Sequence, residues 1–170
     1  MAYGPVIVST DFIENCLQQD RLLDPKDYPL KDEATEKRFN FSLLEAHERA
    51  KANPNQLFQG WTIYCVEDIR GGFDTFKHII EANGGRCNKY RGRPGTTVSS
   101  RNQNNEAHSR DQNPREDVIL ISERSQNRLW PRFRQMAQTS GAIPKIVESD
   151  WVLNSALSQQ VLPVEPHELC

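Results

Sequence analysis

The sequence predicts an α/β fold in which a parallel β-sheet carries helices on its faces. From residue 61 onward, strand-like and helix-like segments alternate in the order β-α-β-β-α-β-α. One of these segments, residues 118–121, is a continuous apolar run, as expected of a strand covered on both faces. The last strand and helix of the pattern are also repeated near the start of the chain. Such alternation favours a parallel sheet over an antiparallel one.

The first half of the pattern spans residues 61–90. Residues 61–66 are rich in β-forming side chains, and Gly71 and Gly72 precede a helix. Its apolar positions follow helical spacing at Phe73, Phe76, Ile79 and Ile80. Gly84 and Gly85 are expected to end this helix, because glycine takes the left-handed conformation without a Cβ penalty. Residues 86–90 then read as a short second strand.

The second half begins with the apolar strand at residues 118–121. A helix follows with Pro131 in its first turn and Gly141 after its end. Its buried stripe is predicted to contain Leu129, Phe133, Met136 and Ala137. Residues 143–147 read as the fourth strand, and Ser149 is expected to cap a last helix. That helix carries Trp151, Val152 and Ala156.

A polar segment separates the two halves. Residues 88–116 are rich in Asn, Gln, Ser, Arg and Gly and offer almost nothing to a core. We expect a disordered insertion at about 91–116. Residues 89–116 carry a net charge of +3, so direct contact with DNA through this segment would be weak and sensitive to salt.

The chain contains an internal repeat at a constant offset of 139 residues. Residues 5–30 align with residues 144–169 with seven identities, and Phe12 stands where the second copy has Trp151. We therefore expect residues 1–30 to be the C-terminal remnant of a first domain and residues 56–170 to be a complete second domain. Phe12 is expected to keep an aromatic ring in the core of the first copy.

Residues 31–55 are predicted to link the two copies through an amphipathic helix. Ser42-x-x-Glu45 is a capping box, and Asn53-Pro54 ends the helix that it opens. The main interpretation is a linker helix that packs its apolar side on one of the domains. A free helix that binds a partner is the alternative.

Composition and motifs exclude several classes of protein. The net charge of −2 does not suggest a general nucleic-acid coat. No apolar run is long enough to span a membrane, and the N-terminus lacks the features of a signal peptide. Four cysteines without a CxxC pair favour a reducing compartment over a disulfide scaffold or a zinc ribbon. The histidines lack catalytic partners at recognisable spacing, and no phosphate-binding glycine loop occurs. We therefore expect no catalytic residue, metal, cofactor or small-molecule substrate.

The pattern resembles the BRCT domain family. The features that carry the resemblance are the helix ended by Gly84-Gly85 and the final strand 143–147 leading into Asp150-Trp151-Val152. The segments 36–43 and 57–64 also resemble the inter-domain segment of tandem BRCT pairs in PTIP-type and fungal genome-maintenance scaffolds. The implied fold is a four-stranded parallel sheet flanked by helices, preceded by the trailing strand and helix of another BRCT repeat.

Tandem pairs of this kind bind phosphoserine peptides, including phosphorylated histone H2A tails. In the family, the first domain holds the phosphate with a Ser or Thr and a following Gly after strand one, and with a Lys on helix two. This chain is expected to begin after those elements. The second copy instead has Glu67 and Asp68 after its first strand, and these carboxylates would repel a phosphate. We therefore expect the second copy to supply specificity rather than a phosphate pocket.

By position in the family pattern, the second copy contributes part of a peptide groove. The candidates are Arg70, Gly71, Ser149, Leu153 and Asn154. Plain solvation of Arg70 and ordinary packing of Leu153 are the alternatives. The expected function is a non-enzymatic interaction module of a nuclear DNA-damage-response scaffold, with phosphorylated protein peptides as partners. A phosphate-independent scaffold or dimerisation module, and weak DNA binding, remain open.

Overall fold

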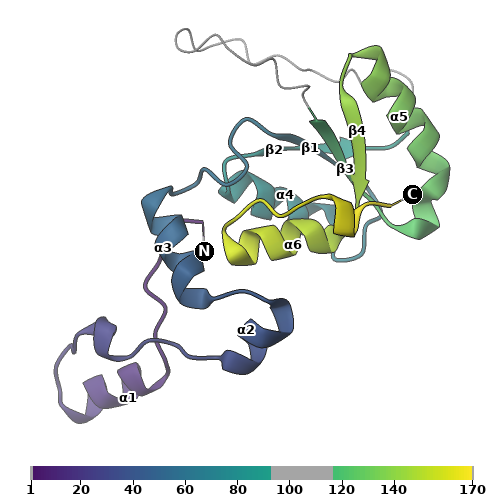
Figure 1. Cartoon of the computed structure of the whole chain (residues 1–170). Coiled ribbons are helices and arrows are strands. Elements are labelled where there is room, and N and C mark those ends of the chain that lie inside the picture. The colour runs from purple at the N-terminus through teal and green to yellow at the C-terminus, as the bar shows by residue number, and fades with distance from the viewer. Residues whose placement is uncertain (1, 93–116, 170) are drawn as a thin grey trace, which may run out of the picture.

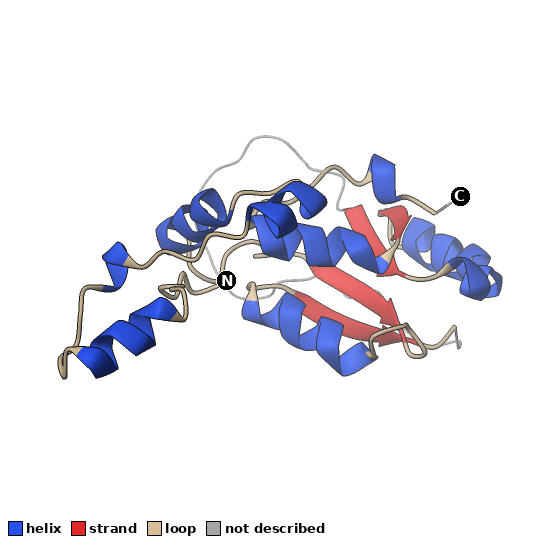
Figure 2. Ribbon diagram, turned by 90° about the horizontal axis from the view of Figure 1, so that it is seen from below, coloured by secondary structure: helices blue, strands red, loops and turns tan. Residues whose placement is uncertain are grey.

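The computed structural model describes residues 2–92 and 117–169, so most of the predicted insertion lies outside the described residues. The described part contains a four-stranded parallel sheet with helices on both faces (Figures 1 and 2). The α/β fold that the sequence predicts is thereby confirmed.

The sheet is built from four strands of five residues each. They are β1 (Thr62–Val66), β2 (Arg86–Tyr90), β3 (Asp117–Ile121) and β4 (Ile143–Val147). The spatial order is β2-β1-β3-β4, and every neighbouring pair is parallel. Ile63 of β1 lies opposite Cys87 of β2 and Ile119 of β3, so β1 and β3 form the buried centre. This explains why β3 is apolar throughout.

Three helices cover the sheet. They are α4 (Phe73–Ala82), α5 (Trp130–Thr139) and α6 (Ser149–Ser158). Helices α4 and α6 lie side by side on one face, and α5 lies on the other (Figure 1). Phe133 of α5 makes edge-to-face contacts with Tyr64 and Tyr90, with ring centroids 5.8 and 5.4 Å away. The alternation of side chains along each strand therefore gives the sheet an aromatic face toward α5.

Trp151 is the largest side chain that is fully buried. Its ring centroid lies 5.9 Å from those of both Phe58 and Trp61, and its Nε1 donates a 2.9 Å hydrogen bond to the Leu162 carbonyl. The indole thus joins α6 to the entry of β1 and to the segment that follows α6.

Backbone conformation and local hydrogen bonds set the end of α4 and the start of α6, and the start of α6 differs from the prediction. Gly84 has a φ of +83°, and the Gly85 N–H donates to the Ile80 carbonyl at 3.0 Å, which closes α4. At the other site, Ser149 is the first residue of α6 rather than its cap. The extended Glu148 takes the N-cap position without a side-chain hydrogen bond. The prediction was wrong by one residue because β4 runs directly into this turn.

The linker contains two helices, α2 (Glu33–Phe39) and α3 (Leu43–Ala52). Ser42 Oγ caps α3 by accepting from the Glu45 N–H at 3.4 Å. Helix α3 packs on α6 through Ala46 and Ala50, which are both buried. Arg49 fixes this contact, because its Nε donates to the Ser158 carbonyl at 2.9 Å.

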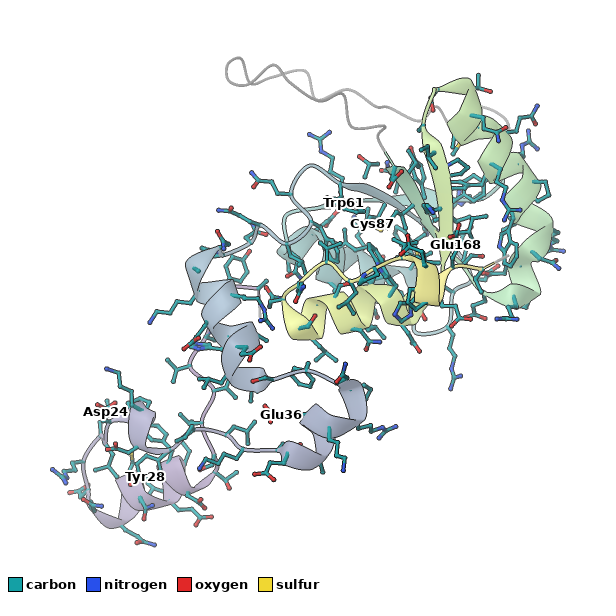
Figure 3. The ribbon with its side chains drawn as sticks, viewed as in Figure 1. Asp24, Tyr28, Glu36, Trp61, Cys87 and Glu168 are labelled. Carbon is teal, nitrogen blue, oxygen red and sulfur yellow. The ribbon has the colours of Figure 1, made fainter. Side chains whose placement is uncertain are left out.

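Residues 5–30 form a small unit with helix α1 (Asp11–Gln18) and the 3-10 turn η1 (Pro25–Asp27). Residues 2–4 lie against the linker, where the Asn55 N–H donates to the Ala2 carbonyl at 2.8 Å. The expected trailing strand is reduced to a single antiparallel bridge between Val8 and Pro29. Figure 3 shows Tyr28 of this unit at the opposite end of the molecule from Glu168.

Phe12 is half-buried and is not a core residue, contrary to the prediction. Its ring contacts Tyr28 edge-on, with centroids 5.7 Å apart. The reason is that no sheet lies beside residues 5–8 within the described part of the chain, whereas its counterpart Trp151 packs on one.

Candidate functional site

The loops that follow β1 and β3 meet at the carboxyl edge of the sheet, where ligands of parallel α/β folds commonly bind. Arg70 and Gly71 lie in the first loop and are exposed. The second loop enters the 3-10 helix η2 (Arg124–Leu129). Ser149 stands at the start of α6, after β4.

The backbone donor after β1 already has a carboxylate partner. The Arg70 N–H donates to Glu123 Oε1 at 2.6 Å, and Gln126 Nε2 donates to the Asp68 carbonyl at 3.1 Å. An anion approaching this N–H would have to displace the carboxylate of Glu123. A carboxylate of the chain itself thus occupies the backbone N–H that a phosphate bound after β1 would need.

Glu67 adds a second carboxylate beside this position, and it too is paired. Arg91 Nε and Lys89 Nζ lie 2.8 and 3.4 Å from its carboxylate oxygens. The hydrogen bond from Arg91, assisted by Lys89, holds the pKa of the Glu67 carboxyl below its ordinary value. Glu67 therefore stays ionised at neutral pH, and Arg91 and Lys89 balance its charge.

A groove of about 650 Å³ opens between α4 and α6, on the other side of the domain from α5. We call it the α4–α6 groove. Its apolar lining comes from Ile79, Ala82, Leu153, Ala156, Leu157, the linker residue Phe39 and the N-terminal Ala2. Asn154, Asp150 and His78 add polar atoms to it. Such a concave, mostly apolar surface with a few polar groups is typical of a ligand groove.

Buried polar side chains hold one end of the α4–α6 groove. Gln159 Nε2 donates to Asn83 Oδ1 at 3.0 Å, and Asn83 Nδ2 donates to the Ile79 carbonyl at 2.7 Å. Both side chains are nearly inaccessible to solvent, so these bonds fix the spacing of α4 and α6.

The structure brings together only two of the five predicted groove residues. Leu153 and Asn154 both line the α4–α6 groove. Arg70 and Gly71 lie at the carboxyl edge of the sheet, next to Glu123, and Ser149 is not among the lining residues. The five candidates therefore lie on two surfaces of the second domain.

Glu123 and Gln126 are the residues that sequence reasoning missed at the carboxyl edge. Their signal was their spacing, since Gln126 stands three residues after Glu123 and its Oε1 accepts from the Glu123 N–H at 3.3 Å. Their partners, Asp68 and Arg70, are too distant in sequence to be inferred from such a pattern.

A second cavity of about 570 Å³ lies between α2, α3 and the end of α6, and two of its carboxylates are already engaged. Glu36 accepts from the Leu43 N–H at 2.6 Å, and Glu45 pairs with Arg49 at 3.3 Å. Within residues 2–92 and 117–169, no cluster of three His, Cys, Asp or Glu side chains is arranged to hold a metal ion. The helices of this described part are all too short or too polar to cross a membrane.

The fold and the sequence together define the class of this protein. The BRCT domain family matches residues 56–168, so the chain belongs to that family. The resemblance recognised in the sequence is therefore confirmed. BRCT domains are typically non-catalytic protein-interaction modules.

Two relatives illustrate the match. BRCT-containing protein 1 of Schizosaccharomyces pombe is 26% identical over 161 residues, which cover 94% of this chain and 17% of that protein. PAX-interacting protein 1 of Bos taurus is 35% identical over 80 residues, covering 47% of this chain and 8% of that protein. The chain therefore spans a small part of the curated relatives that it matches.

Solved structures show the same fold. The crystal structure of the S. pombe Brc1 BRCT5-BRCT6 domains has a TM-score of 0.68 at 23% identity, covering 94% of this chain and 70% of that chain. The complex of Rtt107p with phosphorylated histone H2A has a TM-score of 0.56 at 21% identity, covering 96% of this chain and 64% of that chain.

Proposed function

We propose that this chain is the C-terminal part of a tandem BRCT pair that binds phosphoserine peptides, such as a phosphorylated histone H2A tail. Residues 1–30 end the first domain, residues 31–55 link the two domains, and residues 56–170 form the second domain. The pair acts as a non-catalytic module of a nuclear DNA-damage-response scaffold. Its first domain, supplied by residues N-terminal to residue 1, holds the phosphate.

The hydrogen bond between the Arg70 N–H and Glu123 is the observation that supports a phosphate site in the first domain rather than the second. It fills the donor after β1 with a carboxylate of the chain itself, at 2.6 Å. Glu67 lies nearby and remains ionised. A phosphate carries about −1.5 to −2 charges at neutral pH, so the Glu123 carboxylate opposes its binding there, whereas the charge of Glu67 is balanced by Arg91 and Lys89. This arrangement supports a second domain that does not hold the phosphate.

The likeness to known proteins supports the tandem arrangement. The 161-residue match to BRCT-containing protein 1 is longer than the region that matches the BRCT domain family, so it extends into the segment before residue 56. The Rtt107p structure is a complex with phosphorylated histone H2A, which suggests the class of peptide to test.

Two surfaces of the second domain are available to the peptide. Leu153 and Asn154 offer an apolar and an amide contact in the α4–α6 groove. Arg70 offers an exposed guanidinium at the carboxyl edge, where it can bind a peptide carbonyl or a C-terminal carboxylate. We propose that residues C-terminal to the phosphoserine contact this domain.

The test is a titration of two proteins with two peptides at one fixed salt concentration. The 170-residue chain should bind a phosphorylated H2A-tail peptide no better than the unphosphorylated peptide. A chain extended upstream in the gene to include the first domain should discriminate between the two peptides. Within the extended chain, Arg70→Ala should weaken binding by about 1–3 kcal/mol if the guanidinium makes a charged hydrogen bond.

Two outcomes would contradict the proposal. Clear phosphate discrimination by the 170-residue chain would place the pocket in the second domain. No discrimination by the extended chain would favour a phosphate-independent scaffold.

Arg124→Ala is a matched control for Arg70→Ala, because Arg124 is also an exposed arginine near this edge but pairs with Glu148 at 3.7 Å.

A further inference from the structure

Positive charge is concentrated in the segment that forms η2 and α5. Residues 124–140 contain four arginines and no Asp, Glu, Lys or His, so their net charge is +4. The whole chain has a net charge of −2, which leaves −6 on the remaining residues. The low overall charge of the chain therefore conceals one strongly basic helical segment.

Helix α5 is fixed on the sheet by its apolar side. Phe133 and Ala137 are fully buried, and Trp130 is almost so and donates from Nε1 to Ser122 Oγ at 2.9 Å. The helix lies on the outer side of the sheet, away from the linker helix α3 (Figure 1). With the apolar side held against the core, the polar positions of α5 are turned toward solvent.

Three of the four arginines in this segment are unbalanced by a carboxylate. Arg128 and Arg132 are exposed, and Arg134 is half-buried. Within residues 2–92 and 117–169, none of these three forms an ion pair. Arg124 differs, because it pairs with Glu148 at 3.7 Å. We call Arg128, Arg132 and Arg134 the arginine strip.

The exposed pair of the strip lies on one side of a continuous helical backbone. Arg128 and Arg132 stand four residues apart, and Leu129 and Trp130 between them both have right-handed helical φ and ψ. This spacing makes two side chains neighbours on a helix surface. Exposed side chains with hydroxyl or amide donors accompany the pair in the same segment: Ser125, Asn127, Gln135 and Gln138.

The carboxylates at the neighbouring edge of the sheet are engaged with other partners. Glu123 accepts from the Arg70 N–H at 2.6 Å. Glu67 is paired with Arg91 and Lys89. An anion that approaches α5 from solvent therefore meets positive charge that these side chains do not neutralise.

The surface of η2 and α5 lacks the apolar anchors that other anion-bearing partners would need. All exposed large apolar side chains of the described residues lie between positions 3 and 44. Protein interfaces depend on aromatic and aliphatic anchors, and membrane-bound helices insert an apolar face. Single-stranded nucleic acid is held by stacking on exposed aromatic rings, whereas Trp130 and Phe133 are buried. What remains is a polar, cationic surface suited to a duplex backbone.

We propose that the arginine strip binds the phosphate backbone of double-stranded nucleic acid. The planar guanidinium of arginine matches a phosphate through two parallel hydrogen bonds. Backbone contacts in such complexes also use Ser, Asn and Gln side chains, which this segment exposes. The binding is independent of sequence and falls steeply with salt, because it depends on charge. The strip lies across the sheet from the α4–α6 groove, so a peptide in that groove leaves it free.

The test is the binding of a fluorescein-labelled DNA duplex of mixed sequence to the 170-residue chain, followed by fluorescence anisotropy. The titration is repeated from about 50 to about 200 mM salt, over which the logarithm of the binding constant falls by about 0.9 per phosphate contact for each unit of log salt. Arg128→Ala combined with Arg132→Ala should therefore make this slope shallower by about 1.8. The affinity at the lowest salt concentration should fall by at least about tenfold.

Arg21→Ala combined with Arg38→Ala is the matched control. It removes the same charge from exposed arginines of the N-terminal unit and of α2, and it should leave the slope unchanged. Arg128→Lys combined with Arg132→Lys keeps the charge of the strip and should keep the slope. All three pairs should retain the urea midpoint of the native chain, so that a change in binding reports the surface and not the fold.

Several results would overturn the inference. The native chain could fail to bind the duplex at the lowest salt concentration, or the control pair could weaken binding as much as the strip pair. Polyglutamate that competes as well as DNA at equal charge would assign the strip to an acidic protein. Binding to vesicles of phosphatidylserine and phosphatidylcholine in place of DNA would assign it to a membrane. No phosphopeptide takes part, so the inference and the proposed function fail separately.

Discussion

Replacing Trp151 by alanine is the sharpest test of how the BRCT domain is held together. The indole is fully buried, contacts Phe58 and Trp61, and donates to the Leu162 carbonyl. A buried Trp removes about 150–250 Å² from water, which corresponds to roughly 4–6 kcal/mol at about 25 cal/mol per Å². That figure is an upper bound, because the unfolded chain already buries part of this surface.

We therefore expect Trp151→Ala to lower the free energy of unfolding by about 3–5 kcal/mol, the range for large aromatic side chains in cores. A domain of ordinary stability has about 5–15 kcal/mol in total, so the variant is expected to be marginal. Trp151→Phe restores the aromatic residue of the first copy but lacks the indole N–H. It should cost about 1–2 kcal/mol, mainly through the orphaned Leu162 carbonyl.

The assay is urea unfolding followed by far-ultraviolet circular dichroism, with midpoint and slope compared between variants. Leu44→Ala is the control, since this side chain is 68% exposed and should change stability by less than about 0.5 kcal/mol. A Trp151→Ala protein with the midpoint and slope of wild type would refute the assignment of Trp151 as the anchor of the core.

Two further predictions concern backbone fit and thiol burial. Gly84→Ala should lower the free energy of unfolding by about 2–4 kcal/mol, because φ is +83° and the new Cβ would overlap a backbone carbonyl. Gly60→Ala should lower it by only about 1–2 kcal/mol, since φ is +82° but no atom lies within 4 Å of the new Cβ. Equal losses for the two variants in urea unfolding would contradict the overlap at Gly84. Burial raises the pKa of Cys65 and of Cys87 to about 12, so below that pH the thiols stay protonated in the folded state. Iodoacetamide at mildly alkaline pH should label the half-buried Cys16 before either of them, as peptide mapping would show, and labelling of Cys65 at the unfolded rate would contradict its burial.

Much of the sheet could be predicted because its sequence signals are local. The apolar run of β3 and the glycine pair after α4 each report a single physical requirement, namely burial on both faces and a left-handed residue at a helix end. Trp151 could be placed because it stands at a fixed position after the last strand. In each case the neighbours in sequence are also the neighbours that decide the structure.

Helix α2 was missed although its sequence carried a signal. Asp32 Oδ1 accepts from the Thr35 N–H at 3.0 Å, acidic residues occupy the first turn, and Lys37 and Arg38 occupy the last. This is the charge pattern that a helix dipole favours. The helix lacks an apolar stripe, so hydrophobic periodicity does not predict it.

The remaining differences depend on long-range contacts. The hydrogen bond from Arg70 to Glu123 joins loops 53 residues apart in sequence. Phe12 was expected in a core because its counterpart is in one, but burial depends on the sheet beside it and not on the repeat itself. Sequence periodicity reports which face of an element is apolar; it does not report what that face meets.

The closure of the sheet also has a consequence for how this protein is made. Leu169 lies in the core, its N–H donates to the Ile146 carbonyl at 2.7 Å, and the adjacent Glu168 bridges β4. A ribosome releases the chain from its N-terminus, so β1 and the apolar β3 emerge well before residue 169. Until then β4 lacks its bridge to Glu168 and the core lacks Leu169, so the apolar surface that Leu169 covers is exposed and promotes aggregation. The domain is thus expected to fold only after residue 169 has been released, and its nascent chain is a natural client for chaperones.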